Sequence, residues 1–466
     1  MSLTAISPLD GRYRPKVQAL GEYFSEFALN RYRVMVEVEV FTALLGAVHK
    51  DLNRFGPDAF AQLRKIYEEF DAVDAEEIKQ IERKTNHDMK AVEYYLKERI
   101  RRIPGLASEV EFVHFGLTSE DVSNLAYACM LRDATHDVML PAVLDVLQAI
   151  RDLASRNKTV PMLSRTHGQS ATPTTLGKEM AVFAHRMLPE ISALHRFQMT
   201  GKLNGATGTF GSLATAYPDV DWIAFSEQVI RRLQLVPNMI TTQIEPHDRI
   251  AALCDHFRRI NHILLDFDQD MWRYISDGYL RQRAVAGEIG SSAMPHKVNP
   301  IDFENSEGNL GLANALFVFF GEKLTKSRLQ RDLSDSTVLR NLGVAFGHAL
   351  LAYKSTVQGL RRVESDPERM RQDLDAHPEV LAEAYQTILR AKGHAMPYEA
   401  LKELTRGQQV TLDSLHAFVR GLDIDAETRD RLLALTPAGY IGLAVPLTER
   451  ALTDTDELLL HLRYEH

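Results

Sequence analysis

The chain has 466 residues, of which 45% are hydrophobic and 25% are charged, as in an ordinary globular protein with a large buried core. A formal net charge of −9 and a pI of about 6.0 argue against non-specific nucleic-acid binding. Two cysteines, Cys129 and Cys254, are too few for a disulfide framework and lack a zinc-type spacing, so we expect buried thiols.

The amino terminus has no basic region followed by an apolar core, so no signal peptide is predicted. The most apolar run, residues 310–320, is too short to cross a bilayer. We therefore expect a cytoplasmic protein without a membrane partner.

The first polar stretch with an unusual composition is Thr85-Asn-His-Asp88, which precedes a helical pattern. Asn86 or Asp88 at this position is typical of a helix cap. The alternative is that His87 and its polar neighbours belong to a binding site. The four residues by themselves leave both interpretations open.

The second stretch, His114-Phe-Gly-Leu-Thr-Ser-Glu-Asp121, predicts the start of a helix. Thr118 or Ser119 would cap it, with Glu120 and Asp121 in the first turn. The same free N–H groups and hydroxyls could instead bind a carboxylate.

The third stretch, Ser164–Pro173, contains His167 among hydroxyl and amide side chains. We expect it at a loop-to-helix junction. An isolated histidine is more often structural, but an imidazole that titrates near neutral pH among such neighbours is a credible proton donor.

Long helices dominate the middle of the chain. Apolar residues recur in steps of three and four from Leu253 to Tyr274 and again from Leu339 to Leu360, and residues 312–320 are apolar around most of a helix circumference. Such a helix is typical of a bundle centre or a subunit interface. Strand patterns are nearly absent, although residues 239–244 could form a short extended segment.

The sequence contains no complete calcium, zinc or nucleotide-binding motif. Asp266-x-Asp268-x-Asp270 resembles the start of a calcium loop, but Met271 occupies the position of the required glycine. Residues 201–211 are glycine-rich without the spacing of a dinucleotide or Walker loop, and no His-Glu-x-x-His occurs. We expect no metal and no redox cofactor.

The loop at residues 286–300 combines two glycines, two adjacent serines, a lysine, an asparagine and two prolines. Glycines permit close backbone approach and the polar side chains supply donors, a mixture suited to wrapping a small anion. Farther on, Arg331, Ser336 and Arg340 place two guanidinium groups and a hydroxyl within a short segment. That spacing suits a phosphate, and a surface salt-bridge cluster is the alternative.

These patterns predict an all-α fold, an elongated antiparallel helix bundle flanked by two smaller helical domains. The breaks at Pro104-Gly105 and Ser365-Asp-Pro367 divide the chain into an N-terminal helical domain (1–110), a long central bundle (111–365) and a C-terminal helical domain (366–466).

The string Gly290-Ser-Ser-x-Met-Pro-x-Lys-x-Asn-Pro300 resembles the signature loop of the fumarase/aspartase superfamily. The regions around Thr118-Ser119 and His167 resemble its two other signature regions. Thr85–Asp88, Thr242–Asp248 and Gln330–Thr337 resemble the branch that acts on succinylated purine nucleotides. The similarity runs from Ser7 almost to the C-terminus, with one departure at Ser170, where the family usually carries proline.

The resemblance implies a β-elimination that releases fumarate from succinylated purine nucleotides. It implies His167 as the general acid, Ser291 as the general base and His87 as an orienting residue, although Ser292 is nearly as plausible a base as Ser291. It also implies a set of substrate-binding residues: Arg12, Tyr13, Asn86, Asp88, Thr118, Ser119, Gln243, Lys297, Asn299, Arg331, Ser336 and Arg340.

The resemblance further implies a homotetramer with sites shared between subunits. A helix of about 30 residues spans roughly 45 Å, so loops at opposite ends of one such helix cannot share a site within one chain. Three alternatives remain: another fumarate-releasing lyase such as argininosuccinate lyase, a catalytically idle helical scaffold, and a nucleic-acid-binding bundle, which the net charge disfavours.

Overall fold

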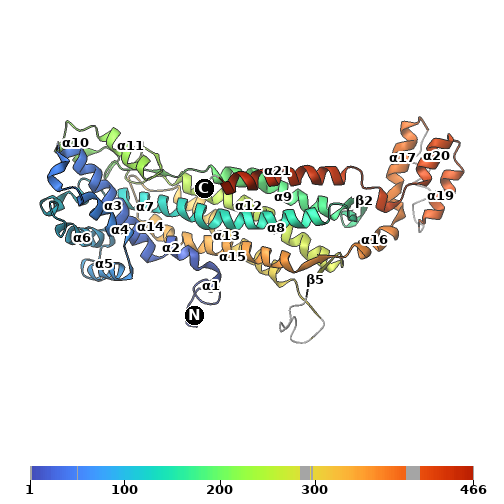
Figure 1. Cartoon of the computed structure of the whole chain (residues 1–466), viewed down its shortest axis with the longest axis horizontal. Helices are drawn as coiled ribbons and strands as arrows, with labels where there is room; N and C mark the ends of the chain where they lie inside the picture. The colour runs from blue at the N-terminus through green and yellow to red at the C-terminus, as the bar shows by residue number, and fades with distance from the viewer. Residues whose placement is uncertain (1–2, 50, 284–293, 295–296, 395–409, 465–466) are drawn as a thin grey trace. The chain divides into compact units, whose positions relative to one another are not determined.

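The computed structural model describes residues 3–49, 51–283, 294, 297–394 and 410–464. Its secondary structure is overwhelmingly helical, so the all-α prediction is confirmed (Figure 1). The chain divides into two compact units. Unit 1 comprises Met1–Ala142, Ala193–Asn261 and Gly308–Ala352, and unit 2 comprises Val143–Ser192, His262–Glu307 and Tyr353–His466. The three consecutive domains drawn from the sequence stay a prediction.

The α-helices have the following bounds: α1 (Arg14–Val17), α2 (Gly21–Phe24), α3 (Glu26–Val48), α4 (Ala59–Glu68), α5 (Ala72–Thr85), α6 (Asp88–Arg101), α7 (Ser119–Ala134), α8 (Leu140–Arg156), α9 (Leu176–His195), α10 (Gly211–Ala216), α11 (Trp222–Arg232), α12 (Asp248–Ser276), α13 (Ile301–Leu324), α14 (Ser334–Leu339), α15 (Leu342–Arg362), α16 (Pro367–Asp375), α17 (Leu381–Ala391), α19 (Leu412–Arg420), α20 (Ala426–Leu433) and α21 (Ala444–Tyr464). Short 3-10 turns are η1 (Gln18–Leu20), η2 (Leu52–Phe55), η3 (Ala107–Phe112), η5 (Pro378–Val380) and η6 (Pro437–Gly439), and η4 (Thr135–Met139) is a π-helical turn.

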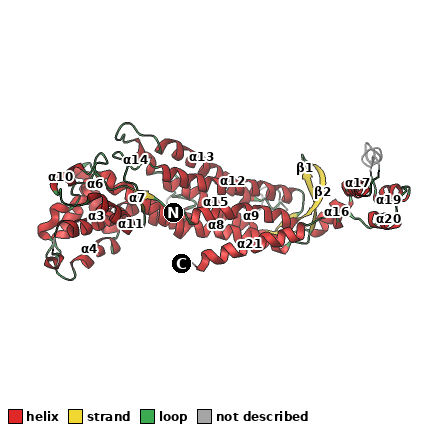
Figure 2. Ribbon diagram, turned by 90° about the horizontal axis from the view of Figure 1, so that it is seen from above, coloured by secondary structure: helices red, strands yellow, loops and turns green. Residues whose placement is uncertain are grey.

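The strands of the described residues form three small two-stranded ladders, drawn in yellow in Figure 2. They are the antiparallel pair β1 (Pro161–Thr166) and β2 (Gln169–Thr175), the parallel pair β3 (Thr200–Gly201) and β4 (Val236–Pro237), and the antiparallel pair β5 (Leu280–Gln282) and β6 (Val363–Ser365). The extended segment expected at residues 239–244 is not a strand.

The β1–β2 hairpin corrects one prediction. His167 lies at the tip of this hairpin and not at a loop-to-helix junction. His167 and Gly168 have φ angles of +53° and +75°, the backbone that a two-residue turn requires when its strands pair directly on either side. Thr166 and Gln169 are that pair.

In unit 1, helices α3 to α6 enclose an apolar core (Figure 1). Ser25 begins α3 by accepting a hydrogen bond from the Ala28 N–H at 3.1 Å, and Asp71 begins α5 through a capping box with Asp74. The large buried side chains of this core include Phe41 and Tyr95. Each such side chain contributes about 1.5–3 kcal/mol by leaving water.

The apolar stripe predicted between Leu253 and Tyr274 lies on α12 and is confirmed. Its members from Leu253 to Met271 are buried, and Tyr274 is partly exposed. Asp268 is buried on the same helix, where its Oδ1 accepts a hydrogen bond from Thr356 at 3.4 Å. Burial raises the pKa of Asp268 well above its ordinary value because the charged form is desolvated.

Helix α13 is not buried on all sides by its own chain. Ala313, Phe317 and Phe320 are buried, whereas Leu312 is 54% exposed and Phe319 is 50% exposed. The bundle-centre interpretation is therefore wrong for this face, because the described chain leaves about half of the Leu312 and Phe319 side chains exposed. The subunit-interface interpretation stays a prediction.

In unit 2, helices α17, α19 and α20 form a small apolar cluster of their own, to which Tyr385, Leu415 and Leu432 contribute (Figure 1). Among the described helices, none by itself is long and apolar enough to span a membrane. One pair bent by 99°, Ala426–Leu433 with Pro437–Leu462, meets that criterion by length and composition alone.

Candidate functional site

The N-terminus of α7 is built as the sequence predicts. Thr118 is the N-cap residue, and its backbone N–H donates to Asp121 Oδ2 at 2.9 Å. Thr118 and the first helical residue, Ser119, are partly exposed, whereas Glu120 and Asp121 are buried. At this helix start, two partly exposed hydroxyl residues are therefore followed by two buried carboxylates.

A fully buried ion pair holds this helix start. Lys202 Nζ lies 3.0 Å from Asp121 Oδ1, and neither side chain is exposed. Asp121 Oδ1 also accepts from the backbone N–H groups of Asn204 and Gly205, at 3.1 and 3.2 Å, and Lys202 Nζ donates to the Gly205 carbonyl at 2.9 Å. The glycine-rich segment thus packs against α7 as a structural part of the site.

One glycine of that segment is sterically required. Gly208 has a φ of +71°, and a Cβ atom there would lie 2.2 Å from the carbonyl oxygen of Thr241. Only glycine permits both the backbone conformation and this close approach.

Beside the ion pair lies a second cluster, formed by the buried Glu120, His247 and Asp335 and the partly exposed Arg331. Arg331 Nη2 is 3.3 Å from Glu120 Oε2 and 3.7 Å from Asp335 Oδ1, while His247 Nε2 is 3.8 Å from Asp335 Oδ2. We call these four residues the Glu120 cluster. It joins three of the segments quoted above, because its members come from 114–121, 242–248 and 330–337.

Burial dominates the electrostatics of the Glu120 cluster. It raises the pKa of Glu120 to about 7, although the nearby charges of His247 and Arg331 oppose the shift. Burial also acts on Asp335, but there the neighbouring His247 and the charge of Arg331, together with the hydrogen bond from the Ser336 N–H, prevail and hold the pKa below its ordinary value. Two neighbouring carboxyls thus have pKa values moved in opposite directions.

Glu120, His247 and Asp335 could in principle hold a cation, because one ligand atom from each lies within 4.8 Å of the others. However, Arg331 already contacts both carboxylates. Its guanidinium supplies the positive charge that a metal would bring, so the donor set does not require one.

Gln243 belongs to the same segment as His247, and its side-chain amide donates to the Ala206 carbonyl at 3.0 Å. Glu245 fixes the same segment, since its carboxylate accepts from the His247 N–H at 2.8 Å and from the Thr200 hydroxyl at 2.9 Å. Ser336 is partly exposed beside Asp335, to which its N–H donates at 2.6 Å.

A second group of charges surrounds Asp88. Its Oδ2 lies 3.0 Å from Arg33 Nη1 and 2.9 Å from Arg340 Nη2, and Arg340 Nη1 lies 2.9 Å from Glu26 Oε2. Burial would raise the pKa of Asp88, but the charge and hydrogen bond of Arg33, the Met89 N–H and the charge of Arg340 together outweigh it, and the pKa is lowered. Arg340 also borders a cavity of about 490 Å³ beside α1 and α2.

His87 corrects the capping prediction. The N-cap residue of α6 is His87 itself, whose Nδ1 accepts from the Lys90 N–H at 3.2 Å, and not Asn86 or Asp88. Asn86 instead ends α5 in a left-handed conformation with φ +51°. An Nδ1 that accepts leaves Nε2 as the protonated atom of a neutral ring, and the ring is 56% exposed.

Near the amino terminus, Arg12 is exposed and its guanidinium lies 5.8 Å from the centroid of the Tyr13 ring. In unit 2, His167 is exposed at the hairpin tip, Lys297 is exposed and Asn299 is partly exposed just before α13. Ser291 and Ser292 lie outside the described residues.

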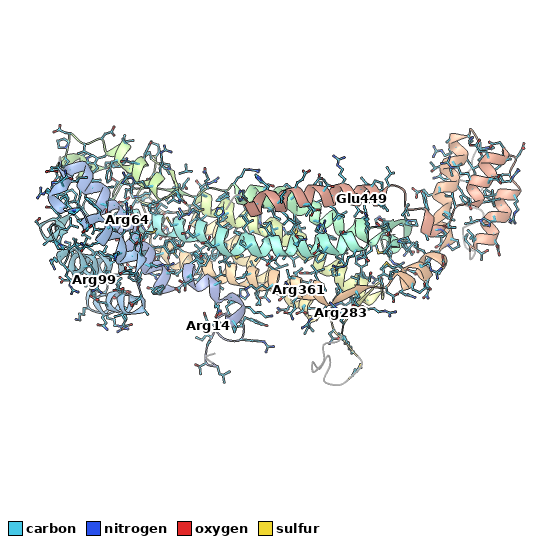
Figure 3. All side chains as sticks on the ribbon, viewed as in Figure 1. Arg14, Arg64, Arg99, Arg283, Arg361 and Glu449 are labelled. Carbon is cyan, nitrogen blue, oxygen red and sulfur yellow. The ribbon has the colours of Figure 1, made fainter. Side chains whose placement is uncertain are left out.

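Unit 2 also has a cavity of about 760 Å³, beside which Arg283 and Arg361 are labelled in Figure 3. Asp152 and Glu364 line it as well, so its charges are balanced. None of the candidate residues drawn from the sequence lies in its lining.

Sequence reasoning missed several buried charges. Lys202 carries no motif, and Asp121 appeared only as a first-turn helix residue. His114 was also missed, yet its Nδ1 lies 2.5 Å from Glu37 Oε1 and its backbone has φ +59°. Burial lowers the pKa of His114, but Glu37 outweighs it and the pKa is raised. Glu37 and Asp121 could have been noticed as charged residues within otherwise apolar helices, whereas Lys202 and His114 lie in loops and had no such signal.

Comparison with known proteins defines the class first. The fold is that of the 3-carboxy-cis,cis-muconate lactonizing enzyme from Pseudomonas putida: 95% of this chain and 97% of that one superpose with a TM-score of 0.73, at 21% identity. A family model described as Lyase matches residues 11–314, and one described as Adenylosuccinate lyase C-terminal matches residues 327–441.

Two curated relatives narrow this class. Adenylosuccinate lyase of Escherichia coli (strain K12) is 51% identical over 98% of this chain and 99% of its own length. That of Vibrio cholerae serotype O1 is 50% identical over 96% of this chain and 99% of its own. The chain belongs to the adenylosuccinate lyase family.

Proposed function

We propose that this protein releases fumarate by β-elimination from adenylosuccinate, giving AMP, and from SAICAR, giving AICAR, in purine nucleotide biosynthesis. The observation that carries the proposal is the meeting of two segments that resemble the purine-specific branch, 242–248 and 330–337, with the signature region around Thr118-Ser119 at the Glu120 cluster, in a chain of this family.

The reaction needs two proton transfers. A base removes the proton from the carbon next to a carboxylate, the C–N bond breaks as the C=C bond of fumarate forms, and an acid protonates the departing nitrogen. We assign the base to Ser291 and the acid to His167. A serine hydroxyl is a poor base, so its alkoxide must be stabilised by neighbouring N–H groups or by Lys297.

Negative charge that builds on the substrate carboxylate needs fixed donors. Lys297 and Asn299 supply them in this proposal, together with the hydroxyls of Thr118 and Ser119 above the buried Asp121–Lys202 pair. A helix start held by a fully buried ion pair keeps its donors in place throughout the reaction.

Recognition of the nucleotide involves the remaining polar residues. Arg331, Arg340, Arg12, Tyr13 and Ser336 bind the phosphate. Arg331 and Arg340 are already placed by carboxylates, so a phosphate meets guanidinium groups that have little freedom left to lose. We assign Gln243 to the succinyl or base portion, and Asn86, His87 and Asp88 to orienting the substrate.

We further propose a cytoplasmic homotetramer in which several subunits contribute residues to each site. The uncovered apolar face of α13, with Leu312 and Phe319 about half exposed, supports an interface there. Light scattering tests the assembly, since glutamate at both positions should lower the molecular mass from that of a tetramer.

The function is tested by fumarate release from adenylosuccinate, beside argininosuccinate, aspartate and malate. Release from adenylosuccinate alone is the expected result. Activity on another of these substrates would show that the assignment of phosphate-binding residues is wrong. A protein inactive on all of them would favour the catalytically idle scaffold.

The base assignment is tested by separate Ser291→Ala and Ser292→Ala variants. We expect Ser291→Ala to abolish turnover and Ser292→Ala to weaken it. The reverse pattern would transfer the role of the base to Ser292.

A further inference from the structure

The β1–β2 hairpin, which carries His167, rests on α16 and the turn that follows it. Leu163 of β1 is buried against Leu374 of α16 and Val380 of η5. The hairpin therefore packs against α16 and η5 through a small apolar cluster within unit 2. Asp373 directly precedes Leu374 on α16.

Asp373 binds two segments at one carboxylate. Arg165 Nη2 lies 2.7 Å from Asp373 Oδ2, and the hydroxyl of Tyr279 donates to the same oxygen. Only 13% of the Asp373 side chain is exposed, and Tyr279 is fully buried. Hydrogen bonds to a shielded carboxylate are the strong ones, and they fix direction as well as distance.

A second contact holds the opposite strand. Ser170 Oγ lies 3.2 Å from His377 Nδ1, which is also 2.8 Å from Glu379 Oε1. His377 Nε2 in turn lies 3.7 Å from Asp373 Oδ1.

The Asp373–Arg165 and His377–Ser170 contacts hold the two members of one cross-strand pair. Arg165 and Ser170 face each other across the hairpin, one rung from the pair Thr166 and Gln169 that closes the turn. Both strands are thus fixed from one side immediately before the tip. A two-residue turn has little freedom once its last rungs are held, so the position of His167 follows from them.

We infer that Asp373 is a positioning residue, which holds the hairpin through Arg165 so that His167 stays in the geometry for proton donation. The inference rests on the function proposed above. Asp373 also binds Tyr279, which immediately precedes β5, the strand from which the chain runs on toward Ser291.

The test compares Asp373→Asn with a matched control. In Asp456→Asn the control removes an Arg–Asp pair of the same length, 2.7 Å to Arg151, which also lies in unit 2 and does not involve the hairpin. We expect Asp373→Asn to lower kcat about 10- to 100-fold with KM changed less than about 3-fold, because misplacing a reacting group by an ångström costs that much. The control should stay within about 2-fold.

Two further measurements separate positioning from a loss of folding. Hydrogen exchange at residues 161–175 should quicken in Asp373→Asn and not in the control. Arg165→Ala should lower kcat similarly, and adding Asp373→Ala to it should cause little further loss. The inference is overturned if Asp373→Asn and the control have equal kcat values, or if exchange in the hairpin is unchanged. An inactive wild-type protein would refute the proposed function instead, and hairpin exchange alone would then decide whether Asp373 holds His167.

Discussion

Asp121 and Lys202 form a buried pair whose two members should differ greatly in their contributions to stability. Asp121 binds Lys202 and also accepts three backbone N–H bonds, from Thr118, Asn204 and Gly205. Among the described residues, Lys202 Nζ without Asp121 keeps the Gly205 carbonyl as its one hydrogen-bond acceptor. The Asp121 carboxylate thus has four stabilising contacts, and Lys202 Nζ has two.

Replacing Asp121 by alanine leaves a buried, unpaired ammonium group, which costs about 3–5 kcal/mol. It also leaves three N–H groups without their acceptor, at about 1–3 kcal/mol for each one that water cannot reach. We therefore expect Asp121→Ala to lower the free energy of unfolding by about 5 kcal/mol or more. Lys202→Met should cost less, about 2–3 kcal/mol, because the carboxylate keeps its three backbone donors.

Urea unfolding followed by circular dichroism measures both values, at one fixed protein concentration because any assembly would add to the apparent stability. The double variant gives the coupling between the two residues, and we expect it to be more stable than Asp121→Ala. Equal losses in the two single variants, or a larger loss in Lys202→Met, would refute the reasoning.

Three further predictions concern other parts of the chain. Burial raises the pKa of Asp268 in the folded state, so this residue stabilises the fold fully only below its unfolded-state pKa, near 3.8. The stabilisation is lost as the pH rises from that value through the folded-state pKa. Asp268→Asn should therefore raise the melting temperature more at pH 8 than at pH 5. Gly208→Ala should destabilise by more than about 2 kcal/mol, since its Cβ would collide with Thr241, whereas Gly168→Ala, with open space around it, should cost about 1 kcal/mol in the same urea experiment. Arg331→Ala should lower kcat/KM for adenylosuccinate about 10- to 150-fold and leave the dephosphorylated nucleoside much less affected; equal losses on both would contradict phosphate binding.

Much of the fold follows from patterns that are local in the chain. The stripe from Leu253 to Met271 predicts α12 because apolar residues at helical spacing need one common buried face. Thr118 and Asp121 predict the start of α7 because a cap and its partner are three residues apart. The family was also visible in short ordered strings, and the comparisons confirm it.

The tip of the hairpin shows where local patterns fail. His167 with Gly168 is a weaker turn signal than asparagine with glycine, and β1 and β2 carry hydroxyl and charged residues in place of a clean alternation. What stabilises the hairpin is its seat on α16, through Leu163 and Asp373, and that contact joins segments far apart in the sequence.

The candidate site shows the same difference between features that are local in the chain and contacts between distant segments. The sequence by itself determined which residue types are present: the hydroxyls at 118 and 119, the imidazole at 167, the guanidinium groups at 331 and 340. Only the tertiary structure decided which charges are buried together, as in the Asp121–Lys202 pair and the Glu120 cluster. The physical reason is that helix and cap preferences act over a few residues, whereas the energy of a charge depends on every group that displaces water around it.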